Sequence, residues 1–469
     1  MTPLIATVVY AIAILGLFWL DRDRNSRVSS ALWIPVAWMF LAGSRMVSQW
    51  LLTTPLDDTP TQYLEGSPLD RLILAGLLAV AIIVLLNRRR QVGALLPANG
   101  PILLFFAYCA ISIFWSDYPE IAFKRWTKAL GDLVMVLVAL TEADPSVALK
   151  RLLARAGFLL IPISVLLIKY YPDVGRAYIR WSWTPVYTGA TTNKNFLGMI
   201  CVIFGLASLW RFLQAIRSPG SSRRSGLLIA HGTVLAMVLW LFWMANSLTS
   251  LSCFVMGAGL ITISYMSPLA RKPAFVHLLV AAMLSVAFSV LFLNIGTSLV
   301  ENLGRDSTLT GRTELWKQVL GMSANPFVGA GFESFWLGQT LDKLWSKYWW
   351  HPNEAHNGYL EVYLNLGWMG IALLALLLVK GYRNVVNNVR RVPDVGSLGL
   401  AYFVVAVAYN FTEAGFRMFN PVWIGLLLAI TAVPQASVIE APDVDERVGS
   451  DQRYQEMSAA GTHIYEEVI

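Results

Sequence analysis

Long apolar segments recur along the whole chain, and they constrain its fold more than any other feature of the sequence. A helix crosses a bilayer with about 20 apolar residues and satisfies its own backbone hydrogen bonds in lipid. No series of short alternating strands, typical of a membrane barrel, is present. We therefore expect an all-α polytopic membrane protein with about 12–13 transmembrane helices. The candidate spans are residues 2–20, 29–52, 70–87, 100–116, 126–141, 157–171, 195–213, 226–245, 249–267, 275–296, 358–380, 398–412 and 420–436.

The composition supports one large membrane domain rather than several soluble ones. Hydrophobic residues make up 56% of the 469 residues and charged residues only 14%. A soluble chain of this length would form about three domains. Residues 2–20 lack a basic n-region and precede the charged run Asp21–Arg24, so we read them as a first span rather than a cleavable signal peptide. The cysteines fall inside apolar segments, which favours buried packing over a disulfide or zinc site: Cys109, Cys201 and Cys253.

Basic residues are concentrated in alternate loops between the candidate spans. Under the positive-inside rule these loops are cytoplasmic, so the net charge of +7 reflects topology rather than nucleic-acid binding. The opposite loops are then extracytoplasmic, and residues 297–357 form the largest of them. The cytoplasmic set is Arg22, Arg24, Arg27, Arg88, Arg89, Arg90, Lys150, Arg151, Arg155, Arg211, Arg217, Arg223, Arg224, Arg271, Lys272, Lys380, Arg383, Arg390 and Arg391.

The 297–357 loop has enough apolar content to fold. Residues 311–323 place Leu315, Val319 and Met322 at helical spacing and predict an amphipathic helix. The segment 325–331 then predicts a turn. From about residue 438 the chain becomes polar and acidic, which predicts a disordered cytoplasmic tail. The aromatic residues available to the loop core are Trp316, Phe327, Phe332, Phe335, Trp336, Trp345, Trp349 and Trp350.

Several cations lie in the loops that the topology assigns to the extracytoplasmic side. Lys and Arg in short translocated loops oppose the positive-inside rule, so an anionic partner at the outer leaflet is a reasonable explanation. Arginine is well suited to phosphate because its planar fork matches two oxygens. The alternative is contact with lipid head groups or snorkelling at the interface. These cations are Arg45, Lys124, Arg125, Lys169, Arg176, Arg180, Lys194, Arg312 and Arg417.

His356 lies where the largest loop runs into the span 358–380. An imidazole titrates near neutrality and can take a proton from an attacking hydroxyl, which makes this residue a candidate general base. The alternatives are a structural histidine or a metal site, since several possible ligands crowd together. The five-residue spacing of the two histidines and the intervening Pro352 argue against the metal site. Its members would be His351, Glu354, His356 and Glu361.

Three sequence motifs lie in and next to the largest predicted loop. His356 and Asn357 are followed after nine residues by Gly367 and after two more by Gly370. Upstream, residues Thr310–Trp316 contain a Gly-Arg pair, and residues Asn325–Gly331 read Asn-Pro-x-x-Gly-x-Gly. These segments resemble three motifs of the O-antigen ligase and O-antigen polymerase superfamily: its His-[Asn/Ser/Gln]-x9-Gly-x-x-[Gly/Thr/Tyr] pattern, its Gly-Arg helix and its Asn-Pro-x-x-Gly-x-Gly turn. The resemblance covers about residues 180–430. It divides the chain into N-terminal transmembrane helices (1–178), an O-antigen ligase-like membrane domain including the loop (179–436) and the tail (437–469).

The resemblance implies a metal-independent, inverting glycosyltransferase with a GT-C-like membrane fold and no cofactor. The donor would be a polyprenyl-pyrophosphate-linked glycan and the acceptor a glycan or lipid-linked molecule. The site would face the periplasm from the bacterial inner membrane. By carry-over, His356 matches the proposed base and Arg312 matches an arginine that holds the donor pyrophosphate. Further substrate-binding candidates are Asn357, Arg417 and Arg45.

The sequence departs from the family pattern at the second phosphate-binding arginine. Gly189 is preceded by Val186, Tyr187 and Thr188, where many ligases have an Arg-x-x-Gly arrangement. Arg180 and Lys194 remain as alternatives for this role.

Two further stretches, Gly189–Gly198 and Ser247–Ser250, look like the exopolysaccharide-production branch and favour a polymerase. The alternatives are an O-antigen or protein O-glycan ligase, a lipid-linked oligosaccharide transporter and a non-catalytic assembly scaffold. Membrane lipids, and other exopolysaccharide assembly proteins, are the further partners that this interpretation implies.

Overall fold

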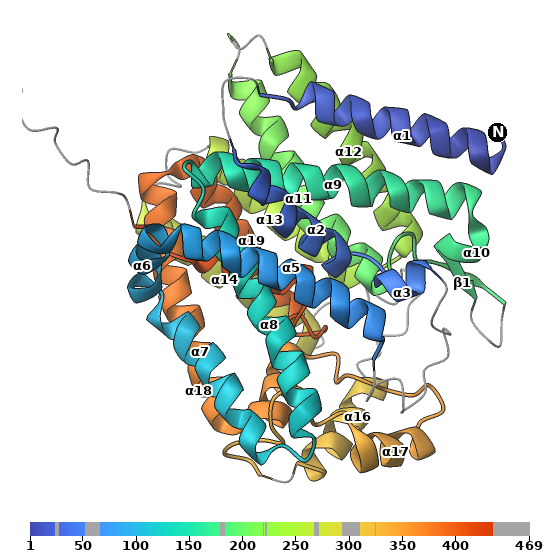
Figure 1. Cartoon of the computed structure of the whole chain (residues 1–469), viewed down its shortest axis with the longest axis vertical. Helices are drawn as coiled ribbons and strands as arrows, with labels where there is room; N and C mark the ends of the chain where they lie inside the picture. Colours follow the sequence, from blue (N-terminus) through green and yellow to red (C-terminus); the bar gives the residue numbers. More distant parts are fainter. Residues whose placement is uncertain are drawn as a thin grey trace, which may run out of the picture. The chain divides into compact units, whose positions relative to one another are not determined.

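The computed structural model describes residues 1–23, 28–51, 66–178, 183–218, 220, 223–266, 272–292, 310–323 and 325–434. Residues Met1–Ala432 form one compact unit, separate from Val433–Ile469. The predicted acidic tail and Arg180 lie outside the described residues. The first unit contains all the helices and strands that are labelled in Figure 1.

Helices account for nearly all regular structure among the described residues, as predicted. Seven of these helices are long and apolar enough to cross a membrane, or eight if a pair bent by 90° counts as one. The seven are α1 (Pro3–Leu20), α5 (Pro68–Asn87), α9 (Pro145–Tyr170), α11 (Lys194–Arg217), α12 (Arg224–Ala245), α13 (Leu248–Met266) and α18 (Gly358–Arg391). The bent pair is α6 (Arg89–Ala98) and α7 (Gly100–Ile111), the latter extended by the 3-10 turn Ser112–Trp115.

The other elements pack around these helices. Among them, α8 (Pro119–Leu140) is long but carries charged residues in its first half. The others are α2 (Trp33–Ala42, after the 3-10 turn Ser30–Leu32), α3 (Val47–Trp50), α10 (Pro172–Gly175), α14 (Pro273–Phe292), α16 (Thr310–Gly321), α17 (Gly338–Lys347), α19 (Pro393–Tyr409) and α20 (Pro421–Ile430). The strands β1 (Arg176–Tyr178) and β2 (Pro185–Tyr187) form one antiparallel hairpin.

Every predicted span overlaps a helix, which confirms the all-α polytopic membrane fold. The number of long helices is smaller than the predicted span count for a physical reason. The predicted span 29–52 is interrupted after α2, where the Arg45 backbone N–H bonds the Ala190 carbonyl instead of continuing a helix. Similarly, α20 ends at Ile430 and leaves only ten residues in helical form.

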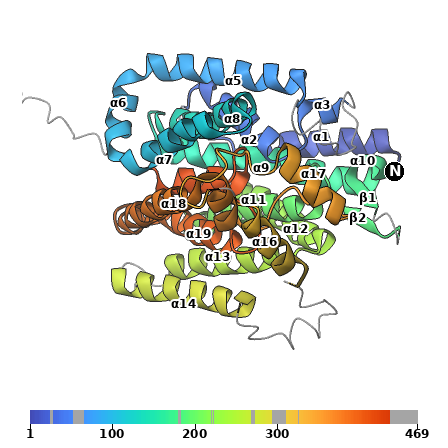
Figure 2. The same cartoon turned by 90° about the horizontal axis from the view of Figure 1, so that it is seen from below.

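The most buried helices form the centre of the unit. Within an apolar stretch of 18 residues in each helix, 78% of the residues are buried in α9 and 72% in α11. Only 11% of the residues are buried in the corresponding stretches of α1 and α5. Figure 2 shows α5 and α14 along opposite edges, with α11, α18 and α19 between them. The exposed sides of α1 and α5 are apolar, with Leu15 68% and Leu72 72% exposed. Lipid is the solvent that such faces require.

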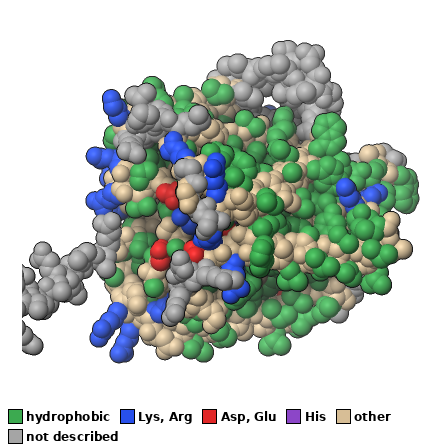
Figure 3. Space-filling view, turned by 90° about the horizontal axis from the view of Figure 1, so that it is seen from above, with side chains coloured by type: hydrophobic (Ala, Val, Ile, Leu, Met, Phe, Trp, Pro, Cys, Tyr) green, Lys and Arg blue, Asp and Glu red, His purple; other side chains and the backbone are tan. Residues whose placement is uncertain are grey.

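Ion pairs join the helix ends at which the predicted cytoplasmic loops begin. Arg211 lies 3.0 Å from Asp21, and Arg88 lies 2.6 Å from Glu142. Figure 3 shows most of the Lys and Arg side chains over one half of the visible face, while hydrophobic side chains cover most of the other half. These ion pairs therefore bring together several of the loops that are predicted to share one side of the membrane. Two more pairs in this region are Lys150–Asp394 and Arg223–Asp23.

The largest predicted extracytoplasmic loop folds around a small hydrophobic core of its own. Helix α16 confirms the predicted amphipathic helix and buries Leu315 and Val319 against Leu341 and Leu344 of α17. Three tryptophan indole N–H groups donate hydrogen bonds to residues 352–355 and to the first turn of α18. The donors and acceptors are Trp316 to the Ala355 carbonyl at 2.7 Å, Trp345 to the Pro352 carbonyl at 2.9 Å, and Trp336 to the Glu361 carboxylate at 2.9 Å.

Helix α18 is broken at Gly367, where φ is 63° and ψ is −164°. The predicted turn 325–331 fits against this break: the Trp368 N–H bonds the Pro326 carbonyl at 2.9 Å. A Cβ on Gly367 would lie 2.3 Å from the Phe327 backbone. Glycine is therefore required at this motif position both for its backbone conformation and for the close approach of the turn. This junction holds the loop subdomain against the membrane helices.

Candidate active site

His356 is presented by a short segment between the loop core and α18. Its own φ is 49°, and the next residue, Asn357, caps α18 by accepting a hydrogen bond from the Leu360 N–H at 2.9 Å. The Asn357 amide also donates to the Phe411 carbonyl at 3.1 Å. The motif asparagine thus fixes the start of α18 and the 410–420 loop, which runs from α19 to α20. Its predicted role in binding substrate stays a prediction.

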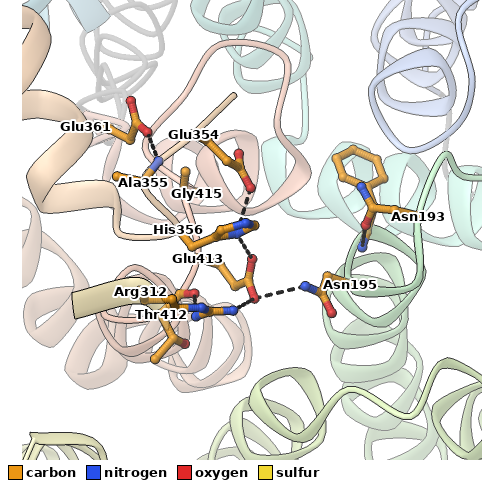
Figure 4. A network of polar contacts seen from close by, with 12 residues as sticks. Asn193, Asn195, Arg312, Glu354, Ala355, His356, Glu361, Thr412, Glu413 and Gly415 are labelled. Atoms are coloured by element: carbon orange, nitrogen blue, oxygen red, sulfur yellow. Dashed lines mark hydrogen bonds and ion pairs between the residues drawn. The ribbon is translucent and has the colours of Figure 1, made fainter. Parts of the chain in front are cut away.

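Two carboxylates share the Nδ1 atom of His356. This atom lies 3.0 Å from Oε1 of Glu354 and 3.3 Å from Oε2 of Glu413 (Figure 4). Burial alone would lower the pKa of His356, but hydrogen bonds and charges of these two carboxylates raise it to about 10. The described residues give Nε2 no hydrogen bond. The ring is thereby oriented through Nδ1, with Nε2 left for another molecule.

Glu413 also contacts Arg312, the cation that the Gly-Arg motif singled out. Arg312 donates to the Thr412 carbonyl at 2.5 Å and lies 3.4 Å from Oε1 of Glu413. The same oxygen accepts a 3.2 Å hydrogen bond from Asn195 in the first turn of α11. Glu413 is only 8% exposed at its side chain. One buried carboxylate therefore connects the two predicted site residues, which come from different parts of the loop.

Arg417 is bound on two sides by carboxylates. It lies 3.1 Å from Glu333 and 3.0 Å from Glu354. Burial would lower the pKa of Arg417, but the surrounding carboxylates raise it. In turn, burial would raise the pKa of Glu354, whereas His356 and Arg417 lower it to about 2. Arg417 is therefore part of the cluster, and its guanidinium offsets the charge of Glu333 and Glu354. Its predicted role in binding substrate stays a prediction.

The other predicted cations occupy different positions. Arg45 is buried, and its guanidinium donates to the Gly189 carbonyl at 2.8 Å and the Val174 carbonyl at 2.6 Å. These contacts hold the backbone at Val174 and Gly189 and involve no member of the His356 cluster. Lys194 is exposed in the first turn of α11, next to Asn195, which touches Glu413.

No sequence motif singles out Glu413, and Glu354 stands out in the sequence only as a possible metal ligand. The available signal was an ionisable side chain between two short apolar segments, which is costly near a membrane and is commonly functional. Asn195 was missed in the same way, although it lies within Gly189–Gly198.

Three of these side chains have the spacing of metal ligands. Ligand atoms of Glu354, His356 and Glu413 all lie within 4.8 Å of one another. Their remaining oxygens already have partners: Oε2 of Glu354 lies 3.0 Å from Arg417, and Oε1 of Glu413 accepts from Asn195. A metal would also have to displace the proton of His356 Nδ1 that faces both carboxylates. The contacts therefore suit a protonated imidazole better than a metal ion.

Comparison with known proteins shows similarity over much of the chain. Residues 212–375 match the O-antigen ligase family, a range that includes Arg312, His356 and Gly367. The exopolysaccharide production protein ExoQ of Rhizobium meliloti (strain 1021) is 26% identical over 291 residues, or 60% of this chain. The chain spans 64% of the length of that relative.

A second relative, RP358 of Rickettsia prowazekii (strain Madrid E), is named provisionally as a polysaccharide ligase. It is 24% identical over 351 residues, which is 71% of this chain and 80% of the relative. Together with the family match, these similarities confirm the predicted resemblance: the chain is a multi-pass membrane protein, and its residues 212–375 match the O-antigen ligase family.

Proposed function

We propose that this protein is a glycosyltransferase that transfers oligosaccharide units from a polyprenyl-pyrophosphate donor to the end of another glycan. The observation that carries the proposal is the contact of one carboxylate, Glu413, with both His356 and Arg312. A base and an anion-binding cation in one cluster are the two groups that such a transfer needs. The family match and the names of the relatives support a polysaccharide substrate.

In the proposed reaction, Nε2 of neutral His356 takes the proton of an acceptor hydroxyl. The hydroxyl oxygen bonds the anomeric carbon of the donor sugar as the bond from that carbon to the pyrophosphate oxygen breaks. Attack from the face opposite the leaving group inverts the anomeric centre. The polyprenyl pyrophosphate departs with the bonding electron pair, and its charge is stabilised by Arg312. Glu354 and Glu413 stabilise the imidazolium that forms, as the carboxylate does in a catalytic triad.

Arg312 lies against Glu413 in the structure. We propose that this carboxylate stands in for a pyrophosphate oxygen at the guanidinium, because both are oxygen anions that a planar fork can bind. Donor binding then draws Arg312 away from Glu413. Two guanidinium or ammonium groups can neutralise a pyrophosphate, so the proposed reaction uses no metal and no cofactor.

For the second cation, the contacts support Lys194, while Arg180 stays the alternative outside the described residues. Lys194 lies at the N-terminus of α11, whose Asn193 cap accepts from the Phe196 N–H at 2.8 Å. The positive end of the helix dipole favours an anion there. Replacing each cation by Ala and measuring the KM for the donor distinguishes the two.

We further propose that the site faces the periplasm from the bacterial inner membrane. The basic helix ends described above satisfy the positive-inside rule if they are cytoplasmic. Arg312, Arg417 and His356 belong instead to the opposite loops. This grouping of cations around one histidine favours an enzyme over a transporter, which needs its cations along a path through the membrane.

Polymerisation is the favoured form of transfer, because the Rhizobium relative is named for exopolysaccharide production. The name of the Rickettsia relative supports a ligase as the second candidate. Purified full-length protein, incubated with polyprenyl-pyrophosphate oligosaccharides from a polymerase-deficient strain, distinguishes them on a gel. A ladder of products identifies a polymerase, and a single added unit on a lipid or protein acceptor identifies a ligase. No transfer to any acceptor would contradict both.

A further inference from the structure

One carboxylate inside the membrane helices lies apart from the site and has two strong partners. Asp132 of α8 is 0% exposed. Its Oδ1 accepts from the Trp38 indole N–H at 2.8 Å, and its Oδ2 accepts from the Phe419 backbone N–H at 2.7 Å. An ionisable residue within a membrane segment is expensive and is a functional candidate by default.

The backbone that Asp132 binds is in an uncommon conformation. Phe419 has a φ of 58°, a region that non-glycine residues seldom occupy. Its ring makes an edge-on contact with Trp38 at 5.1 Å between centroids, and the Lys128 ammonium lies 4.3 Å from its centre. Strained backbone persists where its surroundings over-determine it. Asp132, Trp38 and Lys128 supply that constraint on one residue.

Phe419 lies at the far end of the 410–420 loop, and the near end is held as firmly. Buried Asn410 accepts from the Gly415 and Phe416 N–H groups, each at 2.8 Å, and donates to the Ala406 carbonyl at 2.7 Å. Between these two anchors lie Glu413, which contacts His356, and Arg417, which contacts Glu354. The anchors therefore determine where both side chains can reach.

We propose that Asp132 is a positioning residue for the site: through the Phe419 N–H it holds the 410–420 loop so that Glu413 and Arg417 meet His356 and Glu354. Helix α8 supports the same cluster a second time, because Arg125 donates a short hydrogen bond to the Glu333 carbonyl. A carboxylate suits this position, since each oxygen accepts one N–H. An asparagine would satisfy one donor and direct its NH2 group at the other.

This inference deepens the proposed function, yet its test needs no substrate. The protein has five histidines, so side-chain NMR of the full-length protein labelled with 15N-histidine can follow each imidazole, and H356A assigns the His356 signal. The charged groups near that ring are Glu354 and Glu413 directly, with Arg417 and Arg312 behind them. Loss of a carboxylate contact changes a neighbouring pKa by about one unit or more.

In D132N, we expect the loop to shift and the pKa of His356 to fall by about one unit or more toward its ordinary value. The matched control is D144N: Asp144 caps α9 by accepting from the Val147 N–H at 3.0 Å and has no contact with the 410–420 loop. This control should leave the His356 signal unchanged. A folded D132N with the wild-type His356 pKa would overturn the proposal, because a residue needed only for stability would not change that signal.

If D132N does not fold, W38F carries the test. It removes one of the two donors to Asp132 and the indole packed on Phe419, so we expect a smaller downward shift. No shift in folded W38F would then overturn the proposal. Transfer activity tests the proposed function separately from the role of Asp132. An H356A variant that still transfers glycan would contradict the proposed function, but it would not change the NMR result for D132N.

Discussion

Oε2 of Glu413 lies 3.3 Å from Nδ1 of His356, although 57 residues separate the two in the chain. The same carboxylate lies 3.4 Å from Arg312 through its other oxygen. This arrangement lets one side chain orient the proposed base and hold the proposed phosphate ligand. We therefore expect the protonation of His356 to depend on Glu413 and on the backbone that brings the two residues together.

Replacing Glu413 by Gln should lower transfer by about 10²- to 10⁴-fold, the range that positioned acid–base groups contribute. The amide keeps the shape but removes the charge that stabilises the imidazolium. Initial rates of glycan transfer by purified protein provide the measurement. The control is E314Q on α16, because Glu314 is exposed and pairs with Lys347 only at 3.8 Å. Equal rates for E413Q and E314Q would contradict the assigned role of Glu413.

The rate of transfer should rise with pH across the neutral and mildly alkaline range. Because the pKa of His356 is raised to about 10, the imidazole is protonated at pH 7. Only the neutral form can accept a proton, so the rate should grow by about tenfold per pH unit until it levels off near that pKa. Glu354, whose pKa is about 2, stays ionised throughout. In E413Q the levelling should occur at a lower pH, and an identical profile for both proteins would contradict this assignment.

Much of the fold could be predicted because apolar length is a local property of the sequence. Each predicted span overlaps a helix, and the turn 325–331 is visible from its own residues. The breaks could not be predicted in the same way. The helix before Arg45 ends because N–H groups of this residue donate to the carbonyls of Val174, Gly189 and Ala190. The kink at Gly367 packs against a turn some 40 residues earlier, at Pro326 and Phe327. Such interruptions depend on partners that only folding supplies.

The site also contains residues that the sequence predicts and residues that it does not. His356 and Arg312 were predictable because each lies within a motif with fixed spacing. Glu413 and Asp132 carry no such pattern, and their partners lie 57 and 287 residues away along the chain. The structure also shows Asn357 and Arg45 in contacts with backbone groups, information that residue type alone does not contain.

Substituting Gly367 by Ala should disrupt the fold around the site. The new Cβ would lie 2.3 Å from the Phe327 backbone, and φ is 63°. Backbone cannot move away as a flexible side chain can, so we expect a lower melting temperature and loss of transfer. The matched control is G76A in α5, where nothing lies within 4 Å of the added Cβ. A G367A protein as stable and active as G76A would contradict the account of the α18 break.

Chelation should leave transfer unchanged. The Glu354, His356 and Glu413 cluster has ligand spacing, but its oxygens already bind Arg417, Arg312 and Asn195. Treating the purified protein with EDTA and removing the chelate tests this point. Loss of activity that returns with added Mg²⁺ or Mn²⁺ would show that the cluster holds a catalytic cation.

If His356 is the base of a glycan transfer reaction, removal of its imidazole should abolish transfer. Purified wild-type and H356A proteins are incubated with the same polyprenyl-pyrophosphate oligosaccharides, after matching for membrane insertion and melting temperature. The assignment of His356 as the base predicts a ladder of extended products for the wild type and none for H356A. Extended products from H356A at the wild-type rate would contradict it.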